Sequence, residues 1–347
     1  MMMPVTAVKK AVVAYGEVML RLKSPGFERM LQSPQLEVCI GGAEMNVLAS
    51  LARFGHEARL VTTLPDHALG EIALAEIRAL GIGTTGINRR PGRIGLYFLE
   101  SGHGFRPGQI IYDRAHSAFV LDETARSWAD LLSDAALLHL TGITPALSKH
   151  AAASSLQAAQ QARRLGLIVS LDVNFRAQLW EAAPHARDVG LAPLLHQARI
   201  LFASCGDLAA SLGLPLDPNL DSPIEEFERL SASALEYLPE LEVICTCLRL
   251  GEDADRARLI AVGRTRRESY RSAERQIHSM VDRIGTGDAF AAGVLHAHLG
   301  GQSIGRSLDF GVAAAALKHS VAGDINRVSE AEVTACLTGV SAAHIRR

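Results

Sequence analysis

Short apolar runs alternate with longer amphipathic segments along most of this chain. Runs typical of buried strands occupy residues 11–22, 57–64, 135–144, 167–174, 198–204 and 241–249. Segments with helical periodicity lie between them, as at 43–55, 68–81 and 147–165. Repeated strand–helix units of this kind predict an α/β fold in which a mostly parallel central sheet has helices on both faces.

Two regions, 17–40 and 92–115, interrupt this alternation. Each contains strand-like segments joined by Gly and Pro turns, with no helix between them. Antiparallel strands inserted in a doubly wound domain often form a small lid. Since the sequence has no linker-like stretch and no internal repeat, we expect a single domain over residues 1–347 with a β lid from these two regions.

The composition disfavours several classes of function. The 35 Lys and Arg residues balance 37 Asp and Glu residues, which gives a formal net charge of -2. No basic run interleaves with aromatic residues as a nucleic-acid surface would require, and the charged stretch 263–269 is expected to be a solvated turn. Without an 18-residue apolar run or an apolar signal core, the chain is expected neither to be exported nor to span a membrane.

The cysteines and histidines suggest no metal or redox site. Five scattered cysteines in 347 residues favour reduced thiols and a cytoplasmic location. Cys245 and Cys247 would share one face of a strand, but no second pair has zinc-like spacing, so we interpret them as core thiols. His296 and His298 are two apart on an expected helix and face apart. His139 lies in an apolar run typical of a core, and no histidine is assigned a catalytic role.

Polar residues directly follow several of the expected strands. They are Thr141, Gly142, Asp172, Asn174, Arg176 and Ser204. In open α/β sheets, ligands bind beyond the carboxyl ends of the strands. The sequence therefore predicts a site at that edge of the sheet.

The stretch VDRIGTGDAFAAG, residues 281–293, is the most informative motif. It fails the dinucleotide fingerprint because Phe290 stands where the last glycine belongs, and it fails the Walker A pattern because Asp288 follows Gly287. Gly285 and Gly287 allow close backbone approach, and the helix after them offers unpaired N–H groups and a positive dipole end. Asp288 is then either a structural helix cap or a general base beside an anion hole, as hydroxyl phosphorylation needs.

This motif resembles the D-x-x-G-x-G-D-x-F signature of ribokinase-like (PfkB-type) carbohydrate kinases. The chain is most similar to the 2-keto-3-deoxygluconate kinases (2-dehydro-3-deoxygluconokinases) of that family, through AYGEVMLRL, GGAEMNVLASLARFG, YFLESG, YDRAHSA, LHLTGITPALS, SLDVNFRAQLW and ALKHSVAGDINRVS. The resemblance implies a ribokinase-like fold with ATP and Mg²⁺ as cofactors. It also implies phosphorylation of the terminal hydroxyl of 2-keto-3-deoxygluconate, which gives the 6-phosphate.

The resemblance also implies roles for individual residues. Asp288 would be the catalytic base, and Gly285, Thr286 and Gly287 would form the anion hole. The sugar would contact Gly41, Gly42, Asn46, Tyr97, Tyr112, Arg114 and Arg176. The nucleotide, packed near 247–253 and 308–320, would contact Ser204, Arg249, Gly251, Gly285, Gly287 and Asn326.

Arg114 and Arg176 also make chemical sense on their own. A keto-deoxy sugar acid carries a carboxylate, and guanidinium groups recognise carboxylates bidentately. A neutral pentose or hexose would not need them. Taken without the resemblance, either arginine could equally be a solvated or structural residue.

The chain departs from the family pattern at the metal shell and in the anion loop. Ser204 and Asp207 stand where Asn and Glu are usual. Asp207, the implied magnesium ligand, is one methylene shorter, although water could bridge the difference because Mg²⁺ retains water ligands. Thr286 replaces a smaller residue, and its β-branching restricts the backbone.

Alternatives therefore stay open. One is a kinase for ribose, fructose or keto-deoxygalactonate, and another is a degenerate kinase that senses a sugar acid, although the retained Asp288 and Arg283 favour catalysis. A nicotinamide dehydrogenase is disfavoured because no G-x-G-x-x-G follows the first strand. Small-molecule partners and a homo-oligomer are expected, since pairing two lids would bury their exposed strand edges.

Overall fold

The computed structural model describes residues 11–183, 190–251 and 256–339. Its central sheet contains β1 (Ala11–Tyr15), β4 (Ala58–Pro65), β5 (Ile82–Arg90), β8 (Ala135–Thr141), β9 (Ile168–Asp172), β10 (Ile200–Phe202), β11 (Val243–Leu250), β12 (Ala257–Arg264), β13 (Ser269–Arg271) and β14 (Arg275–Ile277). Their order is β13-β12-β11-β10-β9-β8-β1-β4-β5, with β14 paired to β12. The strands from β5 to β11 pair in parallel, and the strands beyond β11 pair antiparallel.

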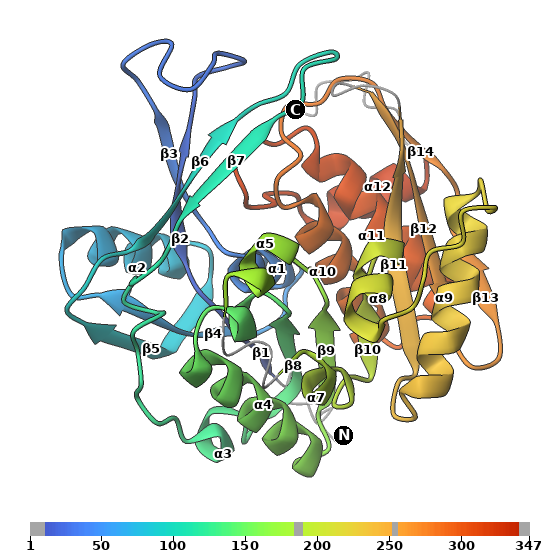
Figure 1. Ribbon diagram of the computed structural model, residues 1–347, viewed down its shortest axis with the longest axis horizontal. Helices are drawn as coiled ribbons and strands as arrows, with labels where there is room; N and C mark the ends of the chain where they lie inside the picture. The colour runs from blue at the N-terminus through green and yellow to red at the C-terminus, as the bar shows by residue number, and fades with distance from the viewer. Residues whose placement is uncertain (1–10, 184–189, 252–255, 340–347) are drawn as a thin grey trace, which may run out of the picture.

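Helices cover both faces of this sheet (Figure 1). One face carries α1 (Ala43–Arg53), α2 (Ala68–Ala79), α10 (Thr286–Leu299), α11 (Ile304–Lys318) and α12 (Glu330–Leu337). The other carries α3 (Trp128–Leu131), α4 (Lys149–Arg164), α7 (Ala192–Leu195), α8 (Cys205–Leu212) and α9 (Pro223–Tyr237). Each set of helices packs its own apolar cluster against the sheet. The predicted α/β architecture is confirmed.

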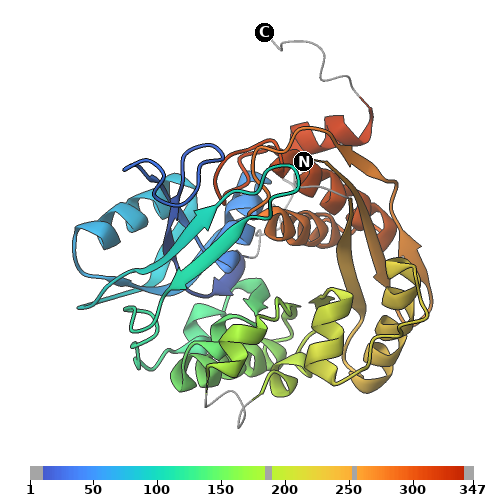
Figure 2. The ribbon, with the colours of Figure 1, turned by 45° about the horizontal axis from the view of Figure 1, so that its top comes forward.

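A smaller sheet stands out from the central one (Figures 1 and 2). It contains β2 (Met19–Lys23), β3 (Glu37–Gly41), β6 (Gly95–Glu100) and β7 (Gln109–Asp113), in the order β3-β2-β6-β7. We call it the lid, since its strands fall in the two regions from which the sequence predicts one. All five residues of β7 are exposed, and the pairing of two lids along such an edge stays a prediction.

The single strand expected over residues 11–22 is wrong, because the chain leaves the central sheet after β1 and enters the lid at β2. The backbone at the crossing runs tightly against α1. A Cβ atom on Gly16 would lie 2.1 Å from Oε2 of Glu44. Only Gly16 and Glu17 interrupt the apolar run at this break, and because both strands are buried, periodicity does not separate them.

The core thiols and the core histidine lie where the sequence predicts them. Cys245 is fully buried on β11, Cys247 is half-buried there, and no disulfide joins the five cysteines. Nδ1 of the buried His139 lies 3.0 Å from Oγ of Ser170. Burial lowers the pKa of His139 to about 3, so this histidine is a neutral core residue.

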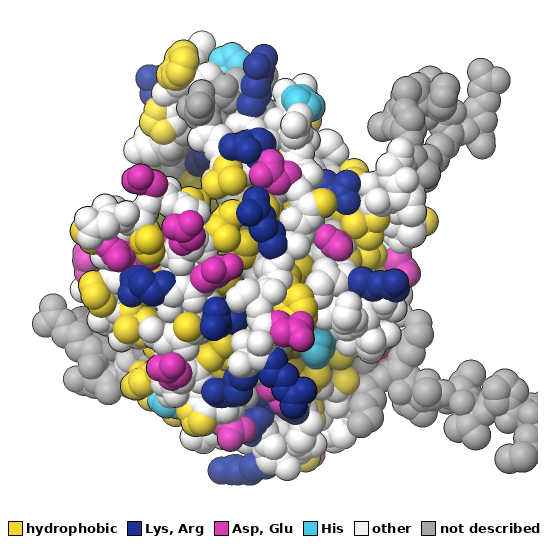
Figure 3. Space-filling model, turned by 90° about the vertical axis from the view of Figure 1, so that its right-hand side faces the viewer, with side chains coloured by type: hydrophobic (Ala, Val, Ile, Leu, Met, Phe, Trp, Pro, Cys, Tyr) yellow, Lys and Arg dark blue, Asp and Glu magenta, His cyan; other side chains and the backbone are white. Residues whose placement is uncertain are grey.

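The surface fits the balanced composition. On the face that Figure 3 shows, basic and acidic side chains are interspersed. The turn 265–268 between β12 and β13 exposes Arg266 and Arg267, within the stretch predicted to be solvated. Among the described residues, no helix combines the length and the apolar character that crossing a membrane requires.

Two glycines bring α10 and α11 into close contact. A Cβ atom on Gly293 would lie 2.8 Å from Cα of Gly311, and one on Gly311 would lie 2.6 Å from Cγ2 of Val294. Since α10 begins within the motif of 281–293, this contact helps to fix the start of that helix.

The close packing is tested by Gly293→Val, which we expect to lower the free energy of unfolding by about 1–3 kcal/mol, because overpacking forces the two helices apart. Urea denaturation measures the change. The matched control is Gly300→Ala at the end of the same helix, where a Cβ meets its nearest atom at 3.4 Å. This control should change stability by less than about 1 kcal/mol. Equal midpoints for the valine variant and the parent chain would contradict the close packing.

Candidate active site

A pocket lies at the carboxyl edge of the parallel strands, where the lid meets the central domain. Asp172 at the end of β9, Ser204 after β10 and Asp288 in α10 line it from the domain, and Tyr97 and Tyr112 line it from the lid. The strand-end rule therefore locates the pocket correctly.

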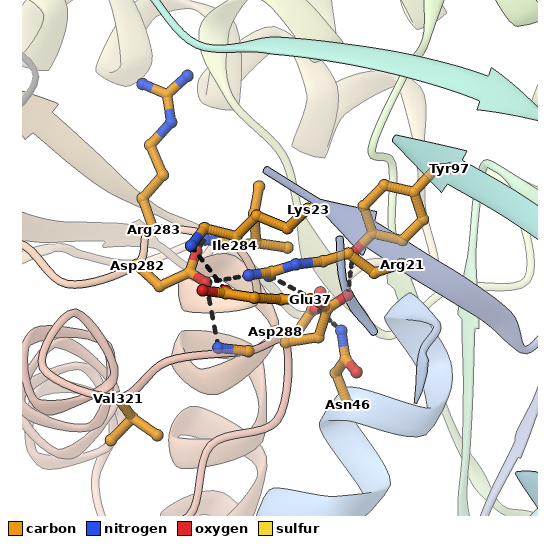
Figure 4. A network of polar contacts seen from close by, with 12 residues as sticks. Arg21, Lys23, Glu37, Asn46, Tyr97, Asp282, Arg283, Ile284, Asp288 and Val321 are labelled. Atoms are coloured by element: carbon orange, nitrogen blue, oxygen red, sulfur yellow. Dashed lines mark hydrogen bonds and ion pairs between the residues drawn. The ribbon is translucent and has the colours of Figure 1, made fainter. Parts of the chain in front are cut away.

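Asp288 is half-buried in the first turn of α10, and Nδ2 of Asn46 on α1 donates a 2.7 Å hydrogen bond to its Oδ2. Figure 4 shows the two side chains facing one another. Desolvation raises the pKa of Asp288 to about 7, and the carboxylates of Asp324 and Glu44 act in the same direction. A carboxylate that titrates near neutrality and lines a pocket is suited to act as a general base.

The loop before Asp288 forms a cradle of backbone amides. Gly285 has φ 79°, and a Cβ atom there would lie 2.0 Å from the carbonyl oxygen of Asp324, so a side chain has no room. A Cβ on Gly287 would meet nothing within 4 Å, which leaves open space above the amides at the start of α10. The first N–H groups of a helix have no acceptor within it, so these amides can hold an anion.

Thr286, the unexpected residue of this loop, has a local role. Its Oγ1 donates a 2.9 Å hydrogen bond to the carbonyl oxygen of Arg283. The hydroxyl thereby closes the turn that leads into α10. We infer that the β-branched side chain stabilises the loop conformation here.

Six of the seven residues implied in sugar binding line the pocket, namely Gly42, Asn46, Tyr97, Tyr112, Arg114 and Arg176. Gly41 is buried behind them, where a Cβ would lie 2.1 Å from Oδ2 of Asp324. A Cβ on Gly42 would lie 2.4 Å from the carbonyl oxygen of Glu17. Both glycines are therefore required by the close approach of neighbouring segments.

The two arginines differ in their surroundings. Nε and Nη2 of Arg114 donate to Oε2 of Glu17 at 2.8 and 2.6 Å, and Ser117 donates to the other oxygen of that carboxylate. The Arg176 side chain is exposed in the pocket lining, and its guanidinium has no hydrogen-bond or ion-pair partner within the described part of the chain. Arg176 is thus the arginine with a guanidinium available to a ligand.

Tyr97 has a more buried position than a ligand contact requires. Its side chain is 4% exposed, and its hydroxyl donates to Oδ2 of Asp324. Its ring lies 5.9 Å from that of Tyr112, which is half exposed. Tyr97 therefore offers the pocket its ring, and its hydroxyl is used within the protein.

The metal role implied for Asp207 competes with a structural one. Ser204 and Asp207 form a capping box at the start of α8, in which Oδ2 of Asp207 accepts hydrogen bonds from N and Oγ of Ser204 at 2.9 and 2.6 Å. Its Oδ1 accepts from N of Phe175 at 2.9 Å. Within the described ranges no three His, Cys, Asp or Glu side chains form a metal-binding group. A magnesium ion here would take most of its ligands from phosphate and water, as Mg²⁺ commonly does.

The residues implied for the nucleotide base are not all at the pocket. Arg249 and Gly251 are exposed at the end of β11, away from the pocket lining, and residues 252–253 lie outside the described residues. Asn326 is buried, and its Oδ1 accepts a hydrogen bond from N of Val328 at 3.2 Å. Their roles toward a nucleotide stay predictions.

Several carboxylates that line the pocket were assigned no role by the sequence analysis. Glu17, Glu44 and Asp324 line it, and Oε1 of Glu44 accepts from the hydroxyls of Thr141 and Thr144. Glu17 directly follows Gly16, and Glu44 stands two residues after Gly42, so a carboxylate close to a glycine was a readable signal at both positions. Asp324 has no such signal, because only the tertiary fold brings it to the site.

Comparison with known proteins agrees with this geometry. The model of the pfkB family carbohydrate kinases matches residues 9–331. A 2-dehydro-3-deoxygalactonokinase of Haloferax volcanii is 32% identical over 328 residues, which are 94% of this chain and 96% of that protein. A 2-dehydro-3-deoxygluconokinase of Bacillus subtilis is 25% identical over 316 residues, which are 90% of this chain and 91% of that one.

The structural comparison points the same way. The crystal structure of a 2-dehydro-3-deoxygluconokinase from Thermotoga maritima superposes with a TM-score of 0.87 and 34% identity, over 95% of this chain and 100% of that chain. The resemblance stated from the motifs is confirmed. A kinase-family match over most of the sequence, a shared fold and a carboxylate of raised pKa beside an amide cradle lead to one conclusion, that this chain belongs to the pfkB family of carbohydrate kinases and transfers a phosphoryl group to a sugar hydroxyl.

Proposed function

We propose that this enzyme uses ATP and Mg²⁺ to phosphorylate the terminal hydroxyl of 2-keto-3-deoxygluconate, which gives the 6-phosphate. The observation that carries the proposal is that one pocket holds both Asp288, as the base, and Arg176, whose guanidinium has no hydrogen-bond or ion-pair partner among the described residues. A neutral sugar gives Arg176 no counter-charge, whereas a sugar acid carries one. The names of the relatives from Bacillus subtilis and Thermotoga maritima support this substrate class.

In this proposal the chain supplies positioning, a base and charge stabilisation. Arg176 holds the sugar carboxylate, Asp288 accepts the proton of the terminal hydroxyl, and the amides of 285–288 hold the negative charge of the transferring group. ATP, when bound, supplies the phosphoryl group, and Mg²⁺ offsets its charge. The carboxylates around the pocket repel phosphate, so a metal ion that accompanies the nucleotide fits this donor set.

A second candidate is the galactonate epimer of the same acid. The relative from Haloferax volcanii, which is named a 2-dehydro-3-deoxygalactonokinase, favours it. Both acids carry the carboxylate and the terminal hydroxyl that the proposed roles require. A coupled ADP-release assay with both epimers, gluconate, ribose and fructose tests the assignment, and faster turnover of ribose or fructose than of either keto-deoxy acid would refute it.

Asp288→Asn should lower kcat by about 10³-fold or more, because the amide cannot accept the hydroxyl proton. The same variant should be at least as stable as the parent chain at pH 8. Since burial raises the pKa of Asp288 from 3.8 to about 7, the folded state binds its proton more tightly than the unfolded chain, and stability falls as pH rises through that window. Calorimetry at pH 8 measures the stability of the variant relative to the parent chain. A variant that retains kcat within about tenfold of the parent would exclude Asp288 as the base.

The kcat/KM for the sugar should rise with pH and level off above about 7, since only the ionised Asp288 acts as a base and its pKa is raised to about 7. Initial rates from about pH 5 to about pH 9 at saturating ATP give the profile. With an ordinary carboxylate as the base, the rising limb of this pH profile would have its midpoint near pH 4 instead. A midpoint there would contradict a desolvated base.

Arg176→Met should lower kcat/KM for keto-deoxy acids by about 100-fold, because a charge-assisted contact to the carboxylate is lost. Turnover of a neutral sugar by the same variant serves as the control and should change little. An equal loss on charged and neutral sugars would assign Arg176 a role in transfer or folding and remove it from carboxylate recognition.

A further inference from the structure

An arginine of the lid reaches into the central domain. Arg21 lies on β2, is 3% exposed and sits between two buried carboxylates. Its Nη1 donates to Oδ1 of Asp324 at 2.8 Å, and its Nη2 donates to Oδ2 of Asp282. Figure 4 shows its guanidinium directed at Asp282.

Both carboxylates are connected to the anion loop. Oδ1 of Asp282 accepts from N of Ile284 at 3.0 Å, and its Oδ2 accepts from N of Gly323 at 3.1 Å. The carbonyl oxygen of Asp324 packs against Gly285, at the N-cap of α10. One guanidinium therefore joins the lid to the two segments that shape the amide cradle.

Arginine is suited to this position. Its planar fork reaches two carboxylates at once, whereas the ammonium group of lysine is a single point charge. The neighbouring buried cation, Lys318, donates to the carbonyl oxygen of Val321 at 2.9 Å. Without Arg21, the buried carboxylates of Asp282 and Asp324 would lose the cation that forms an ion pair with each of them and would retain only the longer-range attraction of Lys318, which a protein interior tolerates poorly.

We propose that Arg21 is a positioning residue for phosphoryl transfer, which makes the geometry of the amide cradle and the charge around Asp288 depend on the seated lid. The residue touches neither sugar nor nucleotide in this role and acts through Asp282 and Asp324. The proposal concerns the transfer step of the family reaction, so it applies to whichever sugar the pocket accepts.

The charge around Asp288 provides a readout that a purely structural role would not change. The groups that face it are Asp324, Glu44 and Asn46, Arg176 and Asp172, and Lys318 from α11. Arg21 offsets the carboxylate of Asp324. Removal of Arg21 leaves the negative charge of Asp324 without its ion-pair partner, and while Asp324 stays ionised this favours the protonated form of Asp288. Removal of the Asp324 charge with Arg21 in place acts in the opposite direction.

The test compares Arg21→Met and Arg21→Lys with Arg126→Met, on the sugar that the parent enzyme phosphorylates fastest. Arg126 is a matched control, because it forms a 2.6 Å ion pair with Asp122 at the same 3% side-chain exposure and lies outside the pocket lining. We expect Arg21→Met to lower kcat by about 100-fold and to move the pH limb of kcat/KM upward by about one unit. Arg21→Lys should recover part of both effects. Arg126→Met should lower the thermal midpoint and leave the limb in place.

A second variant, Asp324→Asn, tests the proposal if Arg21→Met does not fold. Asp324→Asn retains the pairing of Arg21 with Asp282, and it should lower kcat and move the limb to lower pH. Opposite movements of the limb in the two variants support the proposal, as does the downward movement in Asp324→Asn alone. An unchanged kcat and limb in either folded variant would overturn it, and loss of thermal stability alone would make Arg21 a structural residue only. A parent enzyme that prefers a neutral sugar refutes the proposed substrate without affecting this test.

Discussion

The contact of Arg21 with Asp282 and Asp324 joins the lid sheet to the segments before α10 and after α11, and the geometry of the pocket depends on it. The lid supplies the cation, and the central domain supplies two carboxylates from segments on either side of α10 and α11. A buried charged group costs free energy unless all of its partners are present. Loss of any one of these three side chains should therefore disrupt the whole arrangement. The pocket between these parts takes its shape from elements that cannot shift independently.

The fold was predictable because its determinants are local. The alternation of apolar runs and amphipathic segments gave the parallel sheet and its two helical layers, and the Gly and Pro turns marked the strands that leave it. The boundary after β1 escaped prediction because the chain stays buried as it passes from one sheet to the other, and only Gly16 and Glu17 interrupt its apolar run.

The site was predictable only in part, for a related reason. Asp288 and its glycines form a contiguous motif, so their position together in the pocket lining could be predicted directly. The pairing of Arg114 with Glu17 spans 97 positions, and that of Arg21 with Asp324 spans 303, so neither appears in a local pattern. The cap formed by Ser204 and Asp207 was readable, since Ser followed three residues later by an acidic side chain is a capping pattern.

The lid strands occupy two interruptions of the chain, one between β1 and α1 and the other between β5 and α3. Neither interruption alters the order of the central strands or the start of α10. The lid side of the pocket can therefore change in length and side chains while the loop that leads into α10 keeps its position. A family built in this way can acquire new acceptors by revising two insertions, provided that each revision keeps a cation over Asp282 and Asp324.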